Sequence, residues 1–227
     1  MRNQRKNRSI SLILTSAVLI AGCASKPPAF QEGPDAEVTF DGLVRLDHTA
    51  FQRVWADPEA DVSGYTKVLP MRATIEFRAV KPVGSTQRAS SSTTEFPIDE
   101  KTQQKIVDIV SEIFIEEIGK NTRFAITDKP GPDTLILAGS LLDIVSFIPP
   151  EPIGRSDIFV SSVGEITLVI ELKDSLSGET LLRAAERGAA ARPGNTGMRS
   201  NSATNQQEVR RLARRWGTRL REGLDGL

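Results

Sequence analysis

The chain of 227 residues has little of the chemistry that most active sites need, with one cysteine, one histidine and one tyrosine. A single cysteine excludes an intramolecular disulfide bond. One thiol and one imidazole also leave too few soft ligands for a zinc site. Aromatic residues make up only 5% of the sequence, so the stability of the fold must come mainly from burial of aliphatic side chains.

The sequence also lacks an excess of either charge, with 29 basic and 29 acidic residues. The charges are unevenly placed, because residues 1–22 hold four of the basic residues and none of the acidic ones. Removal of that segment leaves 25 basic against 29 acidic residues, a net charge of −4. Binding of nucleic acid requires a surplus of lysine and arginine facing the phosphates. We therefore expect no nucleic-acid partner.

The apolar segment near the N-terminus is too short to cross a bilayer. Ile10–Ala21 has 12 residues, whereas a spanning helix needs about 20. A basic start, a short apolar run and small residues at its end are typical of a secretory signal peptide. The sequence predicts that residues 1–22 form a signal helix that is removed from the mature protein.

The only cysteine follows this segment directly. Ile20, Ala21 and Gly22 precede Cys23, an arrangement that resembles the lipobox of bacterial lipoproteins. The resemblance implies that a diacylglyceryl group is attached to the Cys23 thiol, that a peptidase recognises the three preceding residues, and that the new amino group is acylated. Two or three acyl chains make a durable anchor. This covalent lipid is the only cofactor that we predict; the alternative is an ordinary signal peptide with an unrelated cysteine.

The residue after the cysteine and the composition beyond it predict location and domain organisation. In the enterobacterial sorting rule, aspartate after the lipidated cysteine retains a lipoprotein in the inner membrane, so Ala24 implies the outer membrane, facing the periplasm. Proline and charge in residues 23–62 predict a lipid-anchored tether and an irregular arm. Residues 63–227 are predicted to form a single α/β envelope domain.

Five segments show strand patterns: residues 69–77, 123–127, 134–147, 166–173 and 179–187. Apolar and polar residues alternate in 69–77 and 166–173, which predicts strands with one buried face. Residues 134–147 are apolar at nearly every position, which predicts a central strand that is covered on both faces.

Two segments show helix patterns. Apolar residues spaced by three and four predict a helix over Glu100–Ile118, capped by Asp99. Asn205 and Glu208 have the spacing of a capping box before the last helix. The small and polar residues of 188–204 predict a mobile segment. Together, the elements predict an α+β fold with a mixed, mainly antiparallel sheet of about five strands and two helices packed on it.

Short motifs at strand ends resemble a known family. Tyr65–Val68, Gly131–Leu135 and Glu171–Ser175, followed by Ser177–Glu179, are similar to motifs of the uncharacterised lipoprotein family filed as domain of unknown function 3313. The resemblance covers about residues 35–224. It implies a bacterial envelope lipoprotein and brings no catalytic residues with it.

The residues show no catalytic constellation. A His-based triad needs a positioned nucleophile and an orienting carboxylate. Asp47 and His48 in the predicted arm supply neither alone, because neighbours in the sequence seldom point at the same place. Glu116 and Glu117 are adjacent on the predicted helix and therefore diverge. Glu165 and Glu171 share the polar face of a predicted strand. We expect solvated carboxylates, no catalytic residue, no metal ligand and no enzymatic activity.

The last predicted helix carries a cluster of arginines: Arg210, Arg211, Arg214 and Arg215. One hypothesis is a basic face that contacts anionic headgroups, lipopolysaccharide or peptidoglycan. The other is a solvated helix face whose arginines pair with acids elsewhere in the protein.

Three hypotheses for function follow. The preferred one is a membrane-anchored, non-catalytic interaction or assembly component of the cell envelope, with envelope proteins or further copies of the chain as partners. The alternative is a carrier or sensor of a small apolar or lipidic ligand in the periplasm, which requires an apolar cavity. The third is a hydrolase of wall or lipid. A filled core favours the first hypothesis, and a deep pocket favours the second or third.

Overall fold

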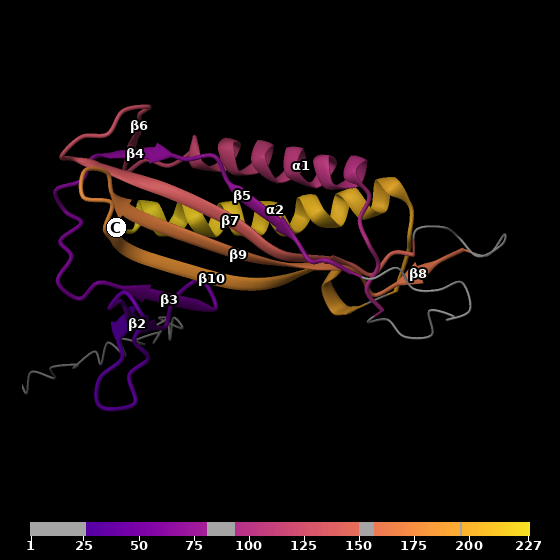
Figure 1. Cartoon of the computed structure of the whole chain (residues 1–227), viewed down its shortest axis with the longest axis horizontal. Helices are drawn as coiled ribbons and strands as arrows, with labels where there is room; N and C mark the ends of the chain where they lie inside the picture. The colour runs from indigo at the N-terminus through magenta and orange to yellow at the C-terminus, as the bar shows by residue number, and fades with distance from the viewer. Residues whose placement is uncertain (1–25, 81–93, 150–156, 196) are drawn as a thin grey trace, which may run out of the picture.

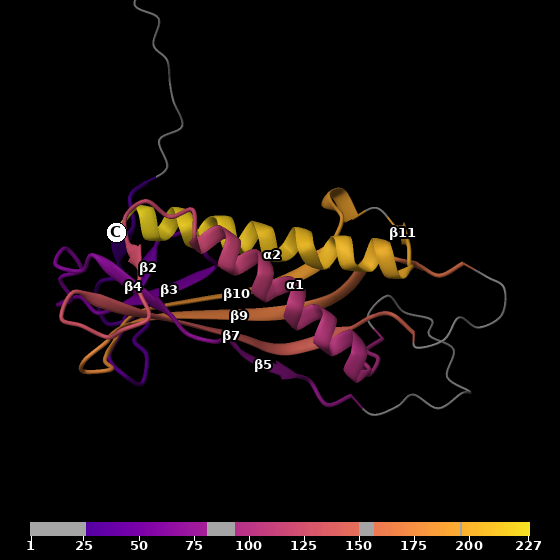
Figure 2. The same cartoon turned by 90° about the horizontal axis from the view of Figure 1, so that it is seen from above.

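The computed structural model describes residues 26–80, 94–149, 157–195 and 197–227. The predicted signal peptide and Cys23 lie outside these residues. Two helices cover one face of a long twisted sheet (Figures 1 and 2). The predicted α+β class is therefore confirmed.

The main sheet contains nine strands, in the order β1-β2-β3-β10-β9-β7-β4-β6, and β5 also pairs with β7. Their bounds are β1 Ala29–Phe30, β2 Val44–Asp47, β3 Arg53–Ala56, β4 Lys67–Pro70, β5 Thr74–Phe77, β6 Ala125–Ile126, β7 Thr134–Ser146, β9 Ser162–Asp174 and β10 Thr180–Ala191. The pairs β4–β6, β4–β7 and β5–β7 are parallel, and the other pairs are antiparallel. The predicted mixed sheet is confirmed, but the expected number of about five strands is wrong.

The extra strands come from two places. The predicted irregular arm contributes β1, β2 and β3, and β3 pairs with β10, where Val54 lies opposite Ala184. The predicted strand 69–77 is two strands, β4 and β5, which residues 71–73 separate and which both pair with β7. Strands of two to four residues are too short to show a hydrophobic period.

The first helix is confirmed. Helix α1 spans Glu100–Ile118, and the Asp99 carboxylate accepts a hydrogen bond from the Thr102 N–H. Helix α2 spans Ser202–Asp225 and begins earlier than predicted. Its cap is Asn201, whose side chain accepts from the Thr204 N–H at 2.9 Å. The predicted capping box at Asn205 is therefore wrong.

The segment 188–204, predicted to be mobile, is largely structured. Strand β10 continues to Ala191, η1 covers Pro193–Asn195, and β11 (Met198–Arg199) pairs with β8 (Phe159–Val160). One of the small residues, Gly188, has a packing reason. A Cβ at Gly188 would lie 2.6 Å from the Trp216 ring, so only glycine lets the strand pass beneath that side chain.

The core lies between the helices and the sheet. Trp216 and Val68 are fully buried. Along β9, every second residue from Ile166 to Leu172 faces the helices and is buried. In the part of the chain that the structure describes, neither helix is long and apolar enough to cross a membrane.

Candidate functional site

The two helices lie close together at their C-terminal ends and apart at their N-terminal ends (Figure 2). Gly217 explains the close end, because a Cβ there would lie 3.0 Å from Cγ of Glu117 on α1. At the other end, a cleft with a volume of about 880 Å³ opens between the helices and the ends of β7, β9 and β10. We call it the N-terminal cleft, because the N-terminal ends of both helices border it.

The floor of the cleft is apolar and its rim is polar. The floor includes Ile106, Ile109, Ile144, Ile158, Ile166 and Val209. The exposed rim includes Asp99, Thr102, Lys105, Asp157, Arg199 and Asn201. Both helix caps therefore stand at the mouth. A concave apolar site with a few polar groups at its edge is the usual form of a small-ligand site.

The charges of the rim nearly balance. The Asp157 carboxylate pairs with the Arg199 guanidinium at 2.7 Å. Asp99 and Lys105 add one charge of each sign. The Thr102 backbone N–H lowers the pKa of Asp99, which keeps that carboxylate ionised. The rim therefore offers both an anionic and a cationic contact to a polar head group.

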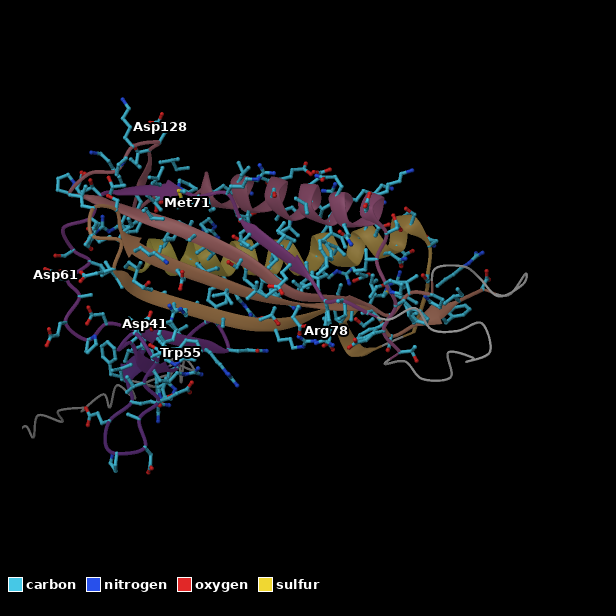
Figure 3. The ribbon with its side chains drawn as sticks, in the orientation of Figure 1. Asp41, Trp55, Asp61, Met71, Arg78 and Asp128 are labelled. Atoms are coloured by element: carbon cyan, nitrogen blue, oxygen red, sulfur yellow. The ribbon has the colours of Figure 1, made fainter. Side chains whose placement is uncertain are left out.

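A second cavity of about 410 Å³ lies between the C-terminal half of α1 and the β4–β5 segment. Val110, Phe114, Leu141 and Leu168 are among its lining residues. Met71, at the break between β4 and β5 (Figure 3), is 53% exposed beside it. Apolar space is therefore present beneath both halves of α1.

The structure divides the predicted arginine cluster. Arg210 pairs with Glu112 at 3.3 Å, and Arg211 pairs with the buried Glu208 at 3.0 Å. Arg214 and Arg215 are exposed and make no ion pair with another residue of the described ranges. The charge of Arg214 nevertheless helps to lower the pKa of Glu116 on α1, after the larger effect of Lys120.

Other arginines form two clusters on the sheet face that the helices leave open. In one, Arg183 donates to Asp41 at 2.7 Å and to Glu171 at 2.8 Å. In the other, Asp143 accepts from Arg78 at 2.5 Å and from Arg187 at 2.6 Å. Asp41 and Arg78 lie far apart along the molecule (Figure 3). The two clusters are therefore separate.

The Asp143 cluster was missed in the sequence, although Asp143 is the only charged residue in the apolar run 134–147. Hydrogen bonds from Arg78 have the largest effect on the pKa of Asp143. Burial opposes them and hydrogen bonds from Arg187 add to them, so that the pKa is lowered to about 2. Asp143 has a positive φ of 56° at the register shift between β7 and β9. Its contacts hold the bulge in place.

A buried carboxylate joins α2 to the sheet. Glu186 on β10 accepts from Nε1 of Trp216 at 2.9 Å and from Arg219 at 2.6 Å. Replacement of either donor would leave a buried charge poorly compensated. These contacts fix how the helix sits on the sheet, and none of the three residues lines the N-terminal cleft.

The remaining sequence candidates are not brought together. His48 is exposed. Glu116 pairs with Lys120, and Glu165 pairs with Arg187 on the open sheet face. Within the described residues, no group of three or more histidine, cysteine or acidic side chains is arranged to hold a metal ion.

No family model and no curated protein matches the sequence, so the predicted resemblance to domain of unknown function 3313 stays a prediction. Three solved structures are similar over most of the chain. Protein XCC0632 of Xanthomonas campestris, a DUF330 protein, is 13% identical with a TM-score of 0.39, covering 73% of this chain and 86% of that one. The PelC dodecamer of Paraburkholderia phytofirmans is 10% identical with a TM-score of 0.30 (72% and 94%).

The third structure is a neuraminyllactose-binding hemagglutinin homolog of Helicobacter pylori, 10% identical with a TM-score of 0.37, covering 70% of this chain and 85% of that one. Because all three TM-scores are below 0.5, we draw no functional conclusion from them. These comparisons assign the chain to no family.

Proposed function

We propose that the protein is a membrane-anchored envelope lipoprotein whose domain binds an amphiphilic ligand without converting it. The observation that supports the proposal is the N-terminal cleft, which has an apolar floor and a rim that carries acidic and basic side chains. The hydrocarbon part of a ligand fits the floor, and a polar or zwitterionic head fits the rim. Of the hypotheses drawn from the sequence, this is the carrier or sensor of a lipidic ligand.

Energetics favour hydrocarbon in this site. Each buried methylene contributes about 0.8 kcal/mol, whereas an unpaired polar group on an apolar floor is costly. The volume of about 880 Å³ lies within the range of about 300–1,000 Å³ that is usual for small-ligand pockets. The cleft is therefore large enough for a ligand of several methylenes.

The anchor is the second part of the proposal. Cys23, preceded by Ile20, Ala21 and Gly22, is proposed to carry the diacylglyceryl and N-acyl groups in the outer membrane, facing the periplasm. Intact mass of the membrane-extracted protein tests this part. We expect cleavage before Cys23 and added acyl mass, both lost in Cys23→Ala. An unmodified thiol in the mature protein would contradict the anchor.

An assembly role is the second candidate, and it has its own observation. Met71, Ile115 and Ile126 are 53%, 72% and 54% exposed, and they lie around β4, β6 and the C-terminal part of α1. Exposed apolar residues near a sheet edge suit contact with another protein. Crosslinking in intact cells tests this role, and the absence of any captured partner or second copy would count against it.

Native mass spectrometry tests ligand binding directly. Ala190 is buried in the cleft wall, so Ala190→Phe places a ring in the space that a ligand needs. We expect the purified wild-type protein to carry an amphiphile of defined mass and the variant to lose most of it. Leu176→Phe is the matched control, because Leu176 is exposed in the turn after β9 and should leave binding unchanged.

Equal ligand occupancy in wild type and Ala190→Phe, with both proteins folded by circular dichroism, would place any ligand elsewhere. A wild-type protein without ligand, which also fails to bind added phospholipid, fatty acid or lysophospholipid, would contradict the proposal.

A further inference from the structure

The chain between the lipid and the first strand is short. Two residues separate Cys23 from Lys26, where the described structure begins, and β1 begins at Ala29. A fully extended chain spans at most about 3.6 Å per residue, so Lys26 lies within about 11 Å of Cys23 and Ala29 within about 22 Å. If Cys23 carries the lipid anchor of the proposed function, on which this inference rests, β1 stays close to the membrane surface.

An apolar patch lies at this end of the molecule. Phe30 lies opposite Leu46, and Val38 lies opposite Val44 on the same edge of β2. Residues directly opposite each other in antiparallel strands share a face, and Val44 and Leu46, two apart, also share one. We call these four residues the arm patch.

The arm patch continues the core-facing side of the sheet beyond the helices. Leu46 lies opposite Val54 of β3, and Val54 is buried in the main core. Further toward the edge, Phe30 is 39% exposed and Val38 is 56% exposed. Apolar surface that begins in the core and remains open at the edge is a contact site for another apolar surface.

The N-terminal cleft lies at the opposite end of the molecule. The first described residues emerge near the C-terminus of α2, whereas β8 and the starts of both helices lie at the far end (Figures 1 and 2). Helix α2 has 24 residues, which corresponds to a length of about 36 Å. The helices therefore separate the arm patch from the mouth of the cleft.

We propose that the arm patch rests on the bilayer that holds the lipid of Cys23, and that the domain stands with the N-terminal cleft facing away from that bilayer. The cleft then receives its amphiphile from the aqueous side, through a carrier or a second membrane. Among the charged residues of 26–38, Lys26, Glu32, Asp35 and Glu37 are exposed, so acidic side chains outnumber basic ones near the patch. The contact is therefore apolar, and added salt leaves it in place because anionic headgroups do not attract this surface.

Position-specific labelling of the lipidated protein tests the orientation. Because acylation consumes the only native thiol, a cysteine introduced at Val38 or Phe159 is the single site for an environment-sensitive fluorophore. Both positions are exposed, and Phe159 lies at the cleft end. The proteins are reconstituted in phosphatidylethanolamine–phosphatidylglycerol vesicles with and without brominated acyl chains. Unlabelled wild type, which should take up no fluorophore, is the control.

We expect the label of Val38→Cys to emit at shorter wavelength and to lose at least half of its intensity to brominated lipid, in low and high salt alike. The label of Phe159→Cys should emit as in water and remain unquenched. Phe30→Cys provides a second reading of the patch and should behave as Val38→Cys does.

Three results would overturn the inference. A label at Val38 that stays in water, or one that is shielded but not quenched by brominated lipid, removes the bilayer as the occupant; the second result indicates a protein partner. Quenching of the Phe159 label shows that the cleft end lies on the membrane. Release of the protein from the vesicles would instead show that the anchor itself is wrong, whereas the other failures leave the anchor and the ligand site standing.

Discussion

At the scale of single residues, Asp143 connects three strands. It adopts a positive φ of 56°, a conformation that aspartate and asparagine tolerate better than most residues, and its carboxylate accepts from Arg78 on one side and Arg187 on the other. The residue thus combines an unusual backbone with two ion pairs. Its conformation and its charge are separable by substitution.

The Asp143→Asn variant removes the charge and keeps the backbone preference. We expect the free energy of unfolding to fall by about 1 kcal/mol near neutral pH, at the upper end for ion pairs screened by solvent. Because the folded-state pKa is about 2 and the ordinary value is 3.8, this contribution is complete above about pH 4 and is lost as the pH falls toward 2. Urea unfolding at a series of pH values measures it.

Asp143→Ala should cost more than Asp143→Asn, because alanine loses the ion pairs and also disfavours a positive φ. A difference between wild type and Asp143→Asn that does not shrink on acidification would show that the charge contributes nothing.

The contact of Gly188 with Trp216 gives a second residue-scale prediction. A Cβ at Gly188 would lie 2.6 Å from the Trp216 ring and 2.8 Å from Cδ1 of Leu212, so Gly188→Ala should lower the free energy of unfolding by about 1–3 kcal/mol. Gly223→Ala is the matched control, since a Cβ there meets no atom within 4 Å. That change should raise the stability by up to about 1 kcal/mol. Equal changes in the free energy of unfolding for Gly188→Ala and Gly223→Ala, measured by chemical denaturation, would contradict this packing.

At the scale of elements, the sequence predicts what is decided locally. The Asp99 cap and α1 follow from a few neighbouring residues, and their bounds are correct. The start of α2 does not follow in the same way, because Asn205 and Glu208 have a capping-box spacing in the sequence, whereas the residue that caps the helix is Asn201. Likewise, β3 pairs locally with β2, but it joins the main sheet through β10, a pairing across more than a hundred residues of sequence.

Capping of α1 supplies the prediction at this scale. Asp99→Ala removes the hydrogen bond to the Thr102 N–H and should lower the temperature of unfolding. Asp99→Asn retains an accepting oxygen, so its temperature of unfolding should remain close to that of wild type. Thermal unfolding of the three proteins measures the difference. If Asp99→Asn lost as much stability as Asp99→Ala, the loss would come from the charge of Asp99 and not from the hydrogen bond of the cap.

At the scale of the whole molecule, the N-terminal cleft depends on an arrangement that no segment specifies alone. Gly217 brings one end of α2 onto α1, and the opposite ends part over the sheet. The apolar residues of the floor, such as Ile106 and Val209, read in the sequence as ordinary core positions. Their role in a cavity is set by the spacing between elements, which hydrophobic periodicity does not encode.

Photo-crosslinking of a diazirine-bearing phospholipid to the purified protein tests the ligand site most directly. Peptide mapping by mass spectrometry should find the adducts on the floor of the N-terminal cleft, around Ile106, Ile166 and Val209, and competition with unlabelled lipid should abolish them. Adducts scattered over the surface, confined to the second cavity, or unaffected by competitor would contradict the account.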